Sequence, residues 1–287
     1  MEFNKYISPL NHEELLQALA KIKHVALDMD GTIYLGNTLF PYTQPFLDSL
    51  RKLGISYSFL TNNPTKNAGD YLLKLRRLGI EATEEQMYTS SIATIDYIHE
   101  HYPEARRIFA LGTPSMQEEF RKGGFELCAD SPEDRPDVLV AAFDMTLTYS
   151  RLCRAAWWAS HADIPYIATN PDWVCPTDEQ TILVDCGSLC KAIEGATKRK
   201  PDVVIGKPNP NMLWCIRDKY KLHDDEIAMV GDRIYTDVAT AQNAGSFGVL
   251  VLSGETTLDV SLTYKRQPDL TAASIKELGE LLLESHS

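Results

Sequence analysis

Two carboxylates, those of Asp28 and Asp30, follow the short apolar run 25–27 and precede Gly31. Such a run predicts a buried strand with the two acids at its carboxyl end. Residues i and i+2 of an extended chain face the same side, so both carboxylates can point into one crevice. Two close carboxylates repel each other unless a proton or a hard cation such as Mg²⁺ lies between them. By itself the pattern also fits a plain turn rich in Asp and Gly.

Three later segments repeat this arrangement of an apolar run that ends in polar residues. They are 55–60, followed by Thr61, Asn62 and Asn63; 203–205, followed by Lys207; and 227–230, followed by Asp232 and Asp237. A lysine at such a position is a compact positive charge for a phosphoryl oxygen, although a lone Lys before Pro is more often an ordinary surface residue. A carboxylate that opens a helix, as predicted for Asp237, is favoured by the helix dipole.

The elements between these polar strand ends, called tips here, determine where the tips lie in the fold. The pattern of apolar residues predicts helices over 44–53 and 66–78, each ended by a glycine, and a first helix that starts near Asn11. Strands that alternate with helices favour parallel strands joined by right-handed crossovers, with all tips on one edge of the sheet. The fold class expected is therefore α/β, with a Rossmann-like doubly wound parallel sheet as its core.

A second module is predicted between residues 104 and 200, where Pro and Gly interrupt the chain more often than before. It has its own alternation of short strands and helices, and its length suffices for a small α/β domain. The domains expected are a discontinuous core, 1–103 and 201–287, and an inserted cap, 104–200. The alternative is one continuous sheet.

Composition limits the classes of function. The chain has 287 residues, a net charge of −12, 44% hydrophobic and 24% charged residues, as in an ordinary globular protein. Its acidic balance argues against a nucleic acid partner, and no apolar run is long enough to cross a membrane. The amino terminus lacks the apolar core of a secretory signal, so a cytoplasmic location is expected. The six cysteines lack zinc-site spacing and are expected to be reduced thiols.

Taken together, the four motifs resemble those of the haloacid dehalogenase superfamily of hydrolases. The motifs are Asp28-Met29-Asp30-Gly31-Thr32, Thr61-Asn62-Asn63, Gly206-Lys207-Pro208, and Gly231-Asp232 with Asp237. An insert between the second and third motifs resembles members with a large α/β cap of the C2 type. Residues 168–172 and 186–190 look more narrowly like the NagD and nitrophenyl-phosphatase branch.

The resemblance implies a Mg²⁺-dependent phosphatase that acts on small phosphomonoesters through an aspartyl-phosphate. Asp28 would be the nucleophile, Asp30 the general acid and base, and Lys207 would hold Asp28 and the phosphoryl group. The metal ligands implied are Asp28, the backbone carbonyl of Asp30, and Asp232, with Asp237 orienting the metal shell or Lys207. The groups expected to bind the substrate are Gly31, Thr61, Asn62, Asn63 and Lys207 in the core and Asn170, Asp172 and Trp173 in the cap.

The substrate itself stays open at this point. Sugar phosphates, nucleoside monophosphates and other small phosphates all fit, whereas Cys175 stands where vitamin-B6-phosphate phosphatases of this branch carry a His, which argues against pyridoxal phosphate. The cap residues also fit a plain turn, and Trp157-Trp158 fits either cap packing or a homodimer surface. Two other functions use the same motifs: a phosphotransferase or phosphomutase, and a non-catalytic protein that binds a phosphate ligand.

Overall fold

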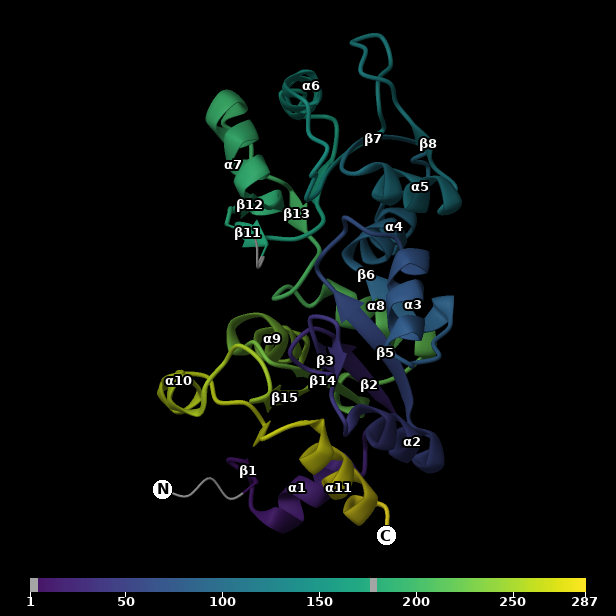
Figure 1. The fold of residues 1–287 in the computed structure, drawn as a ribbon. Helices are drawn as coiled ribbons and strands as arrows, with labels where there is room; N and C mark the ends of the chain where they lie inside the picture. Colours follow the sequence, from purple (N-terminus) through teal and green to yellow (C-terminus); the bar gives the residue numbers. More distant parts are fainter. Residues whose placement is uncertain (1–4, 176–179) are drawn as a thin grey trace. The chain divides into compact units, whose positions relative to one another are not determined.

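A computed structural model describes residues 5–175 and 180–287 of the chain (Figure 1). Its contacts divide the chain into two compact units. Unit 1 comprises Met1–Leu60, Leu72–Met87 and Lys207–Ser287, and unit 2 comprises Thr61–Tyr71 and Tyr88–Gly206. Residues 61–71 and 88–103, which were expected in the core domain, group with unit 2. The predicted domain boundaries near residues 104 and 200 stay a prediction.

The sheet that carries most of unit 1 has the strand order β1-β16-β15-β14-β2-β5-β6. The strands are β1 (Tyr6–Ile7), β2 (His24–Asp28), β5 (Ser56–Thr61), β6 (Met87–Thr89), β14 (Ile227–Gly231), β15 (Phe247–Val251) and β16 (Leu270–Ala272). From β16 to β5 neighbouring strands are parallel, and β1 pairs antiparallel with β16. The middle of β2 is completely buried, as its apolar run predicts. Parallel strands in this order bring the ends of β2 and β14 together.

Helices of unit 1 form two groups. The helices α1 (His12–Leu19), α2 (Thr43–Leu53) and α11 (Ile275–Ser285) pack against one another, and α8 (Asn211–Tyr220) packs against α9 (Ala239–Ala244). In Figure 1 these groups lie on either side of β14 and β15. The first helix begins at Asn11, whose side chain forms a reciprocal capping box with Glu14. The helix α3 (Ala68–Arg77) begins in unit 2 and continues into unit 1.

Unit 2 contains a parallel sheet of its own, with the order β13-β10-β9-β7-β8. Its strands are β7 (Arg107–Leu111), β8 (Glu126–Leu127), β9 (Val138–Ala141), β10 (Tyr166–Ala168) and β13 (Val203–Val204). The helices are α4 (Ser90–His101), α5 (Pro114–Lys122), α6 (Tyr149–Ala159) and α7 (Cys186–Thr197), and β11 (Val174–Cys175) pairs with β12 (Leu183–Val184). Trp158, Phe109 and Tyr166 contribute to its buried core.

The predicted fold class is confirmed, because a parallel α/β sheet forms the core and a smaller α/β sheet interrupts it in the sequence. Helix α4 was not predicted from the sequence. Its buried side chains include Ser90, Ser91 and Thr94, so polar residues hide its inward face from a search for apolar periodicity. No helix in the described part of the chain is long and apolar enough to cross a membrane.

Candidate active site

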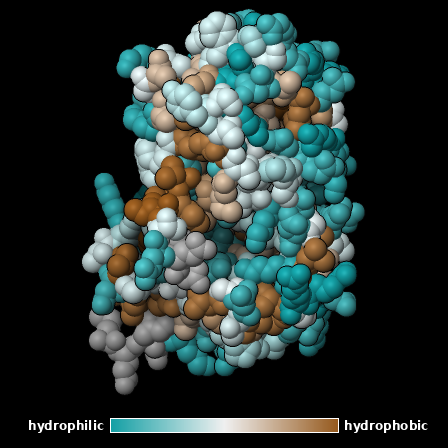
Figure 2. Space-filling view, turned by 45° about the horizontal axis from the view of Figure 1, so that its top comes forward, coloured by the Kyte–Doolittle hydropathy of each residue, from teal (hydrophilic) through white to brown (hydrophobic). Residues whose placement is uncertain are grey.

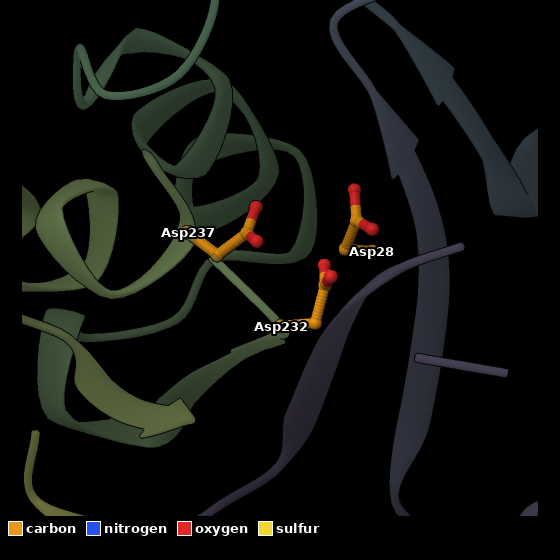
Figure 3. A group of neighbouring side chains, drawn as sticks. All are labelled: Asp28, Asp232 and Asp237. Atoms are coloured by element: carbon orange, nitrogen blue, oxygen red, sulfur yellow. The ribbon is translucent and has the colours of Figure 1, made fainter. Parts of the chain in front are cut away.

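The end of β2 and the end of β14 place two carboxylates side by side in unit 1. Residues 24–27 of β2 pair with residues 227–230 of β14, so Asp28 and Asp232 follow neighbouring strands. Asp237 comes from the π-helical turn Ile234–Val238 that follows Asp232. One carboxylate oxygen from each of the three residues lies within 4.8 Å of the others, and their side chains converge in Figure 3. The expectation that separate sequence motifs meet at one edge is thus met for these three residues.

Lys207 bridges two of these carboxylates. Its ammonium donates to Asp28 Oδ1 at 2.5 Å and to Asp237 Oδ1 at 2.6 Å. The lysine and Asp237 are almost completely buried, and Asp28 is partly buried. Backbone N–H of Arg233 donates to the second oxygen of Asp237, at 3.0 Å, so both oxygens of Asp237 are held. This arrangement fixes Lys207 directly beside Asp28.

Burial and mutual repulsion shift the pKa values of this group. Burial raises the pKa of Asp28 to about 7, with Asp237 and Asp232 adding to the rise while Lys207 opposes it. Burial also raises the pKa of Asp232 to about 6, again with help from Asp237. For Lys207, burial disfavours the charge, but the two carboxylates outweigh it and raise the pKa of the ammonium. Three acids around one lysine leave an excess of negative charge.

Asp232 lies in a narrow space between two glycines. A Cβ on Gly31 would come within 2.4 Å of Asp232 Oδ2, and a Cβ on Gly254 within 2.1 Å of the same oxygen. Gly31 also has a φ of +81°, which disfavours any other residue. The backbone N–H of Glu255 donates to Asp232 Oδ2 at 2.7 Å. This loop after β15 was not predicted to belong to the site. It follows a buried apolar strand, as Asp28 and Asp232 do, and that position could have indicated it.

The same group fits a divalent cation. Asp232 Oδ1 is buried and has no hydrogen-bond partner among the described residues, which is costly unless another ligand reaches it. Carboxylate oxygens at this spacing, with an excess of negative charge, are what a hard cation such as Mg²⁺ takes as ligands. The ammonium of Lys207 and the N–H of Arg233 already donate to the two oxygens of Asp237. The oxygens of Asp28 and Asp232 are therefore the better candidates for metal ligands.

Asp30 differs from the other acids of the site. Its side chain is exposed and does not belong to the group of three carboxylates found among the described residues. Its Oδ1 lies 3.5 Å from the N–H of Gly36. Asp30 is therefore free to reach a molecule in solvent, whereas Asp28 is fixed by Lys207.

Six of the other predicted residues belong to unit 2. Four of them are Asn62, Asn170, Asp172 and Trp173, and polar contacts join the first three. Side-chain amides of Asn62 and Asn170 both donate to Asp172 Oδ2, each at 2.9 Å. Asn170 also donates to Asp185 Oδ1 at 3.0 Å, and burial raises the pKa of Asp185 to about 6. Asn170 is buried with its amide in use, whereas Trp173, the fourth, is 61% exposed.

Thr61 and Asn63 shape the turn after β5. Leu60, the residue before Thr61, pairs with Asp28 of β2. The N–H of Asn63 donates to Thr61 Oγ1 at 3.2 Å, and Asn63 Oδ1 accepts the N–H of Thr65 at 2.9 Å. The Asn63 amide also reaches Cys175 Sγ at 3.7 Å. The side chains of Thr61 and Asn63, which the sequence predicted to bind the substrate, thus make contacts that order the turn.

The fold and the site define an α/β protein with an acidic centre at the ends of its parallel strands, and comparison with known proteins identifies its family. Residues 25–126 match the haloacid dehalogenase-like hydrolase family model, and residues 204–278 match a HAD-hydrolase-like model. The chain belongs to the haloacid dehalogenase-like hydrolases. Within them it falls in the NagD-like branch, as the motifs indicated.

Three relatives illustrate the match. A 4-nitrophenylphosphatase structure from Thermotoga maritima has a TM-score of 0.85 at 39% identity, covering 92% of this chain and 98% of the other. Acid sugar phosphatase of Staphylococcus aureus is 31% identical over 93% of this chain and 99% of its own length. Ribonucleotide monophosphatase NagD of Escherichia coli is 28% identical over 90% and 98%. The predicted enzyme class, a phosphatase, is confirmed.

Proposed function

We propose that this protein is a Mg²⁺-dependent cytoplasmic phosphatase that hydrolyses small phosphomonoesters through an aspartyl-phosphate on Asp28. The observation that carries the proposal is the contact of Asp28 with Lys207, beside an Asp232 oxygen that has no described partner. A dianionic ester repels a nucleophile, so positive charge must be held next to the attacking oxygen. Lys207 supplies that charge, and its second carboxylate, Asp237, fixes its position.

The chemistry divides between two acids with different surroundings. Asp28 attacks phosphorus with the oxygen that Lys207 does not hold, and the bond to the alcohol oxygen breaks. Asp30 protonates the departing alcohol and later takes a proton from the water that hydrolyses the aspartyl-phosphate. The exposed position of Asp30 supports this role, because a general acid must reach the leaving group.

Asp28, Asp232 and the backbone carbonyl of Asp30 would hold Mg²⁺, with Asp237 as the residue that orients Lys207. When bound, the cation neutralises charge on the phosphoryl oxygens. The support is the unpartnered Asp232 oxygen and the close approach of Gly31 and Gly254 to that carboxylate. Substitution of either glycine would displace Asp232 and weaken metal binding.

The remaining predicted residues are proposed to bind the substrate. Gly31, Thr61, Asn62 and Asn63 would hold phosphoryl oxygens, and Asn170, Asp172 and Trp173 would select the alcohol part. Exposure of Trp173 supports contact with a ligand, whereas the burial of Asn170 supports a role through Asp172. The names of the relatives favour sugar phosphates and nucleoside monophosphates as substrates.

Release of free phosphate tests the proposal. The unmutated protein and Asp28→Asn are incubated with sugar phosphates, nucleoside monophosphates, phosphoglycolate, glycerol phosphate and 4-nitrophenyl phosphate, with Mg²⁺ or EDTA. Release that needs Mg²⁺ and vanishes in Asp28→Asn is expected. Absence of release from every ester would contradict the phosphatase, and transfer of phosphate to a second sugar would favour a phosphotransferase or phosphomutase.

We further propose that a homodimer forms through unit 2. Tyr149, Cys153 and Trp157 lie four residues apart on helix α6, so they share one exposed face, whereas Trp158 is buried. On the face drawn in Figure 2, patches of hydrophobic residues lie between hydrophilic ones. Light scattering of the unmutated protein and of Trp157→Glu distinguishes a dimer through α6 from a monomer.

A further inference from the structure

Segment 61–71 runs from the last residue of strand β5 into helix α3 and contains Thr61, Asn62 and Asn63, three of the residues proposed to hold the phosphoryl group. Side chains of unit 2 contact its backbone at several places along its length. Ser90 of α4 donates to the carbonyl of Asn62 at 2.7 Å, and Thr113, the N-cap of α5, donates to the carbonyl of Thr65 at 2.9 Å. The backbone of the segment is thus held at two of its carbonyl groups.

Two side chains of helix α5 make three further contacts at the start of α3. Ser115 Oγ accepts the N–H of Asn67 at 3.2 Å and donates to Asp70 Oδ2 at 2.6 Å. Glu119 Oε1 accepts the N–H of Ala68 at 2.8 Å. An N–H in the first turn of a helix has no partner within the helix, and a carboxylate is favoured at that end. Thr113, Ser115 and Glu119 are called the α5 clamp below.

Glu119 is the member of the α5 clamp that is hardest to explain as ordinary surface chemistry. The side chain is only 6% exposed, and its second oxygen accepts the hydroxyl of Thr89 at 3.0 Å. Burying a carboxylate costs stability unless its hydrogen bonds are satisfied, and here both oxygens have donors. One donor is Ala68 in the segment, and the other is Thr89 at the start of α4. Glu119 therefore joins the segment to the body of unit 2.

We propose that Glu119 is a positioning residue that, with Ser115, sets the conformation of segment 61–71 and thereby the affinity of the enzyme for the phosphoryl group. The inference rests on the proposed roles of Thr61 and Asn62. It assigns a function in phosphate binding to a helix that carries none of the four motifs. The effect acts on the phosphate end of every substrate, so it must be independent of the alcohol part.

Measurements of phosphate affinity test this inference. The affinity for inorganic phosphate is measured by isothermal titration calorimetry for the unmutated protein, Glu119→Leu and Glu119→Gln. The KM values for 4-nitrophenyl phosphate and for one sugar phosphate are measured in parallel. Glu119→Leu is expected to weaken phosphate binding and raise both KM values by about tenfold, each by the same factor. Glu119→Gln keeps an oxygen for the N–H of Ala68 and is expected to restore most of the affinity.

Ser115→Ala keeps the test decisive if Glu119→Leu does not fold, because it removes only the contacts of a small, half-buried side chain with Asn67 and Asp70. It is expected to weaken phosphate binding in the same direction. Unchanged phosphate affinity in a folded Glu119→Leu or in Ser115→Ala, even with a lower melting temperature, would overturn the proposal. Calorimetry needs no turnover. A protein whose phosphate affinity falls in the α5 clamp variants, but which hydrolyses no ester, would therefore contradict only the proposed function.

Discussion

Unit 1 and unit 2 each contain a group of buried and half-buried carboxylates, and they compensate the negative charge in different ways. In unit 1 the ammonium of Lys207 lies between Asp28 and Asp237. In unit 2 the neutral amide of Asn170 lies between Asp172 and Asp185. A lysine supplies a full opposite charge, whereas an amide supplies only hydrogen bonds.

The difference bears on what each group can do. The three acids of unit 1 retain an oxygen without a described partner, on Asp232, so the group can accept a cation. In unit 2 both amide donors on Asp172, from Asn62 and Asn170, fix the orientation of that carboxylate. We infer that the first group is arranged for charge chemistry and the second for orientation. Two measurements can break or sharpen this contrast, and a third tests the burial of the strand that carries Asp28.

The largest effect is expected for Lys207→Met. Removal of the ammonium leaves the partly buried Asp28 and the buried Asp237 without the positive charge that they share, which costs about 3–5 kcal/mol of stability. Urea unfolding at pH 8 measures the loss. Lys200→Met is the control, because that side chain is 74% exposed and its loss is expected to change stability by less than about 0.5 kcal/mol. Equal stabilities of the two variants would show that the charge of Lys207 does not hold the acids together.

A second test uses His24, at the other end of the strand that carries Asp28. Its ring nitrogens contact the hydroxyls of Ser56, at 2.7 Å, and Ser58, at 3.0 Å. Burial, with help from Lys219, lowers the pKa of His24 from 6.5 to about 4. The unfolded chain therefore binds a proton between these pH values that the folded chain does not. Stability is expected to fall by about 3 kcal/mol as the pH drops through this window.

His24→Gln isolates this contribution. Buried acids with raised pKa values, such as Asp185, contribute with the opposite sign over part of the same range, and they are common to both proteins. Urea unfolding of both proteins from pH 7 to pH 4 gives the difference. A difference that does not change with pH would show that His24 is not buried in its neutral form.

The smallest effect is expected for Asn170→Ala in unit 2. Two carboxylates lose a neutral donor, which is expected to cost about 1–3 kcal/mol, less than the loss of the ammonium in unit 1. Asn243→Ala, at an exposed asparagine whose amide donates to the carbonyl of Pro208, serves as the control. A loss as large as that of Lys207→Met would mean that the two groups do not differ in the way proposed.

The pattern of apolar residues predicted some elements of the fold and not others. Apolar runs before Asp28, Thr61 and Asp232 predicted buried strands with polar ends, and the strands form as expected. Helix α4 escaped detection because Ser90, Ser91 and Thr94 fill its buried positions. The grouping of segment 61–71 with unit 2 also escaped, because it depends on Ser90 and helix α5, whose sequence carries no recognisable motif.

The sequence by itself determined the parallel α/β class, the strand ends that carry acids, and the family to which the chain belongs, because these depend on local patterns and on motif order. Only the tertiary structure decided which acids lie within 4.8 Å of one another and share Lys207, since Asp28, Lys207 and Asp237 are far apart along the chain. It also decided that the amide of Asn170 donates to Asp172 and Asp185, while Trp173 is exposed. Hydrogen bonds and burial depend on three-dimensional proximity, and a linear pattern does not specify that proximity.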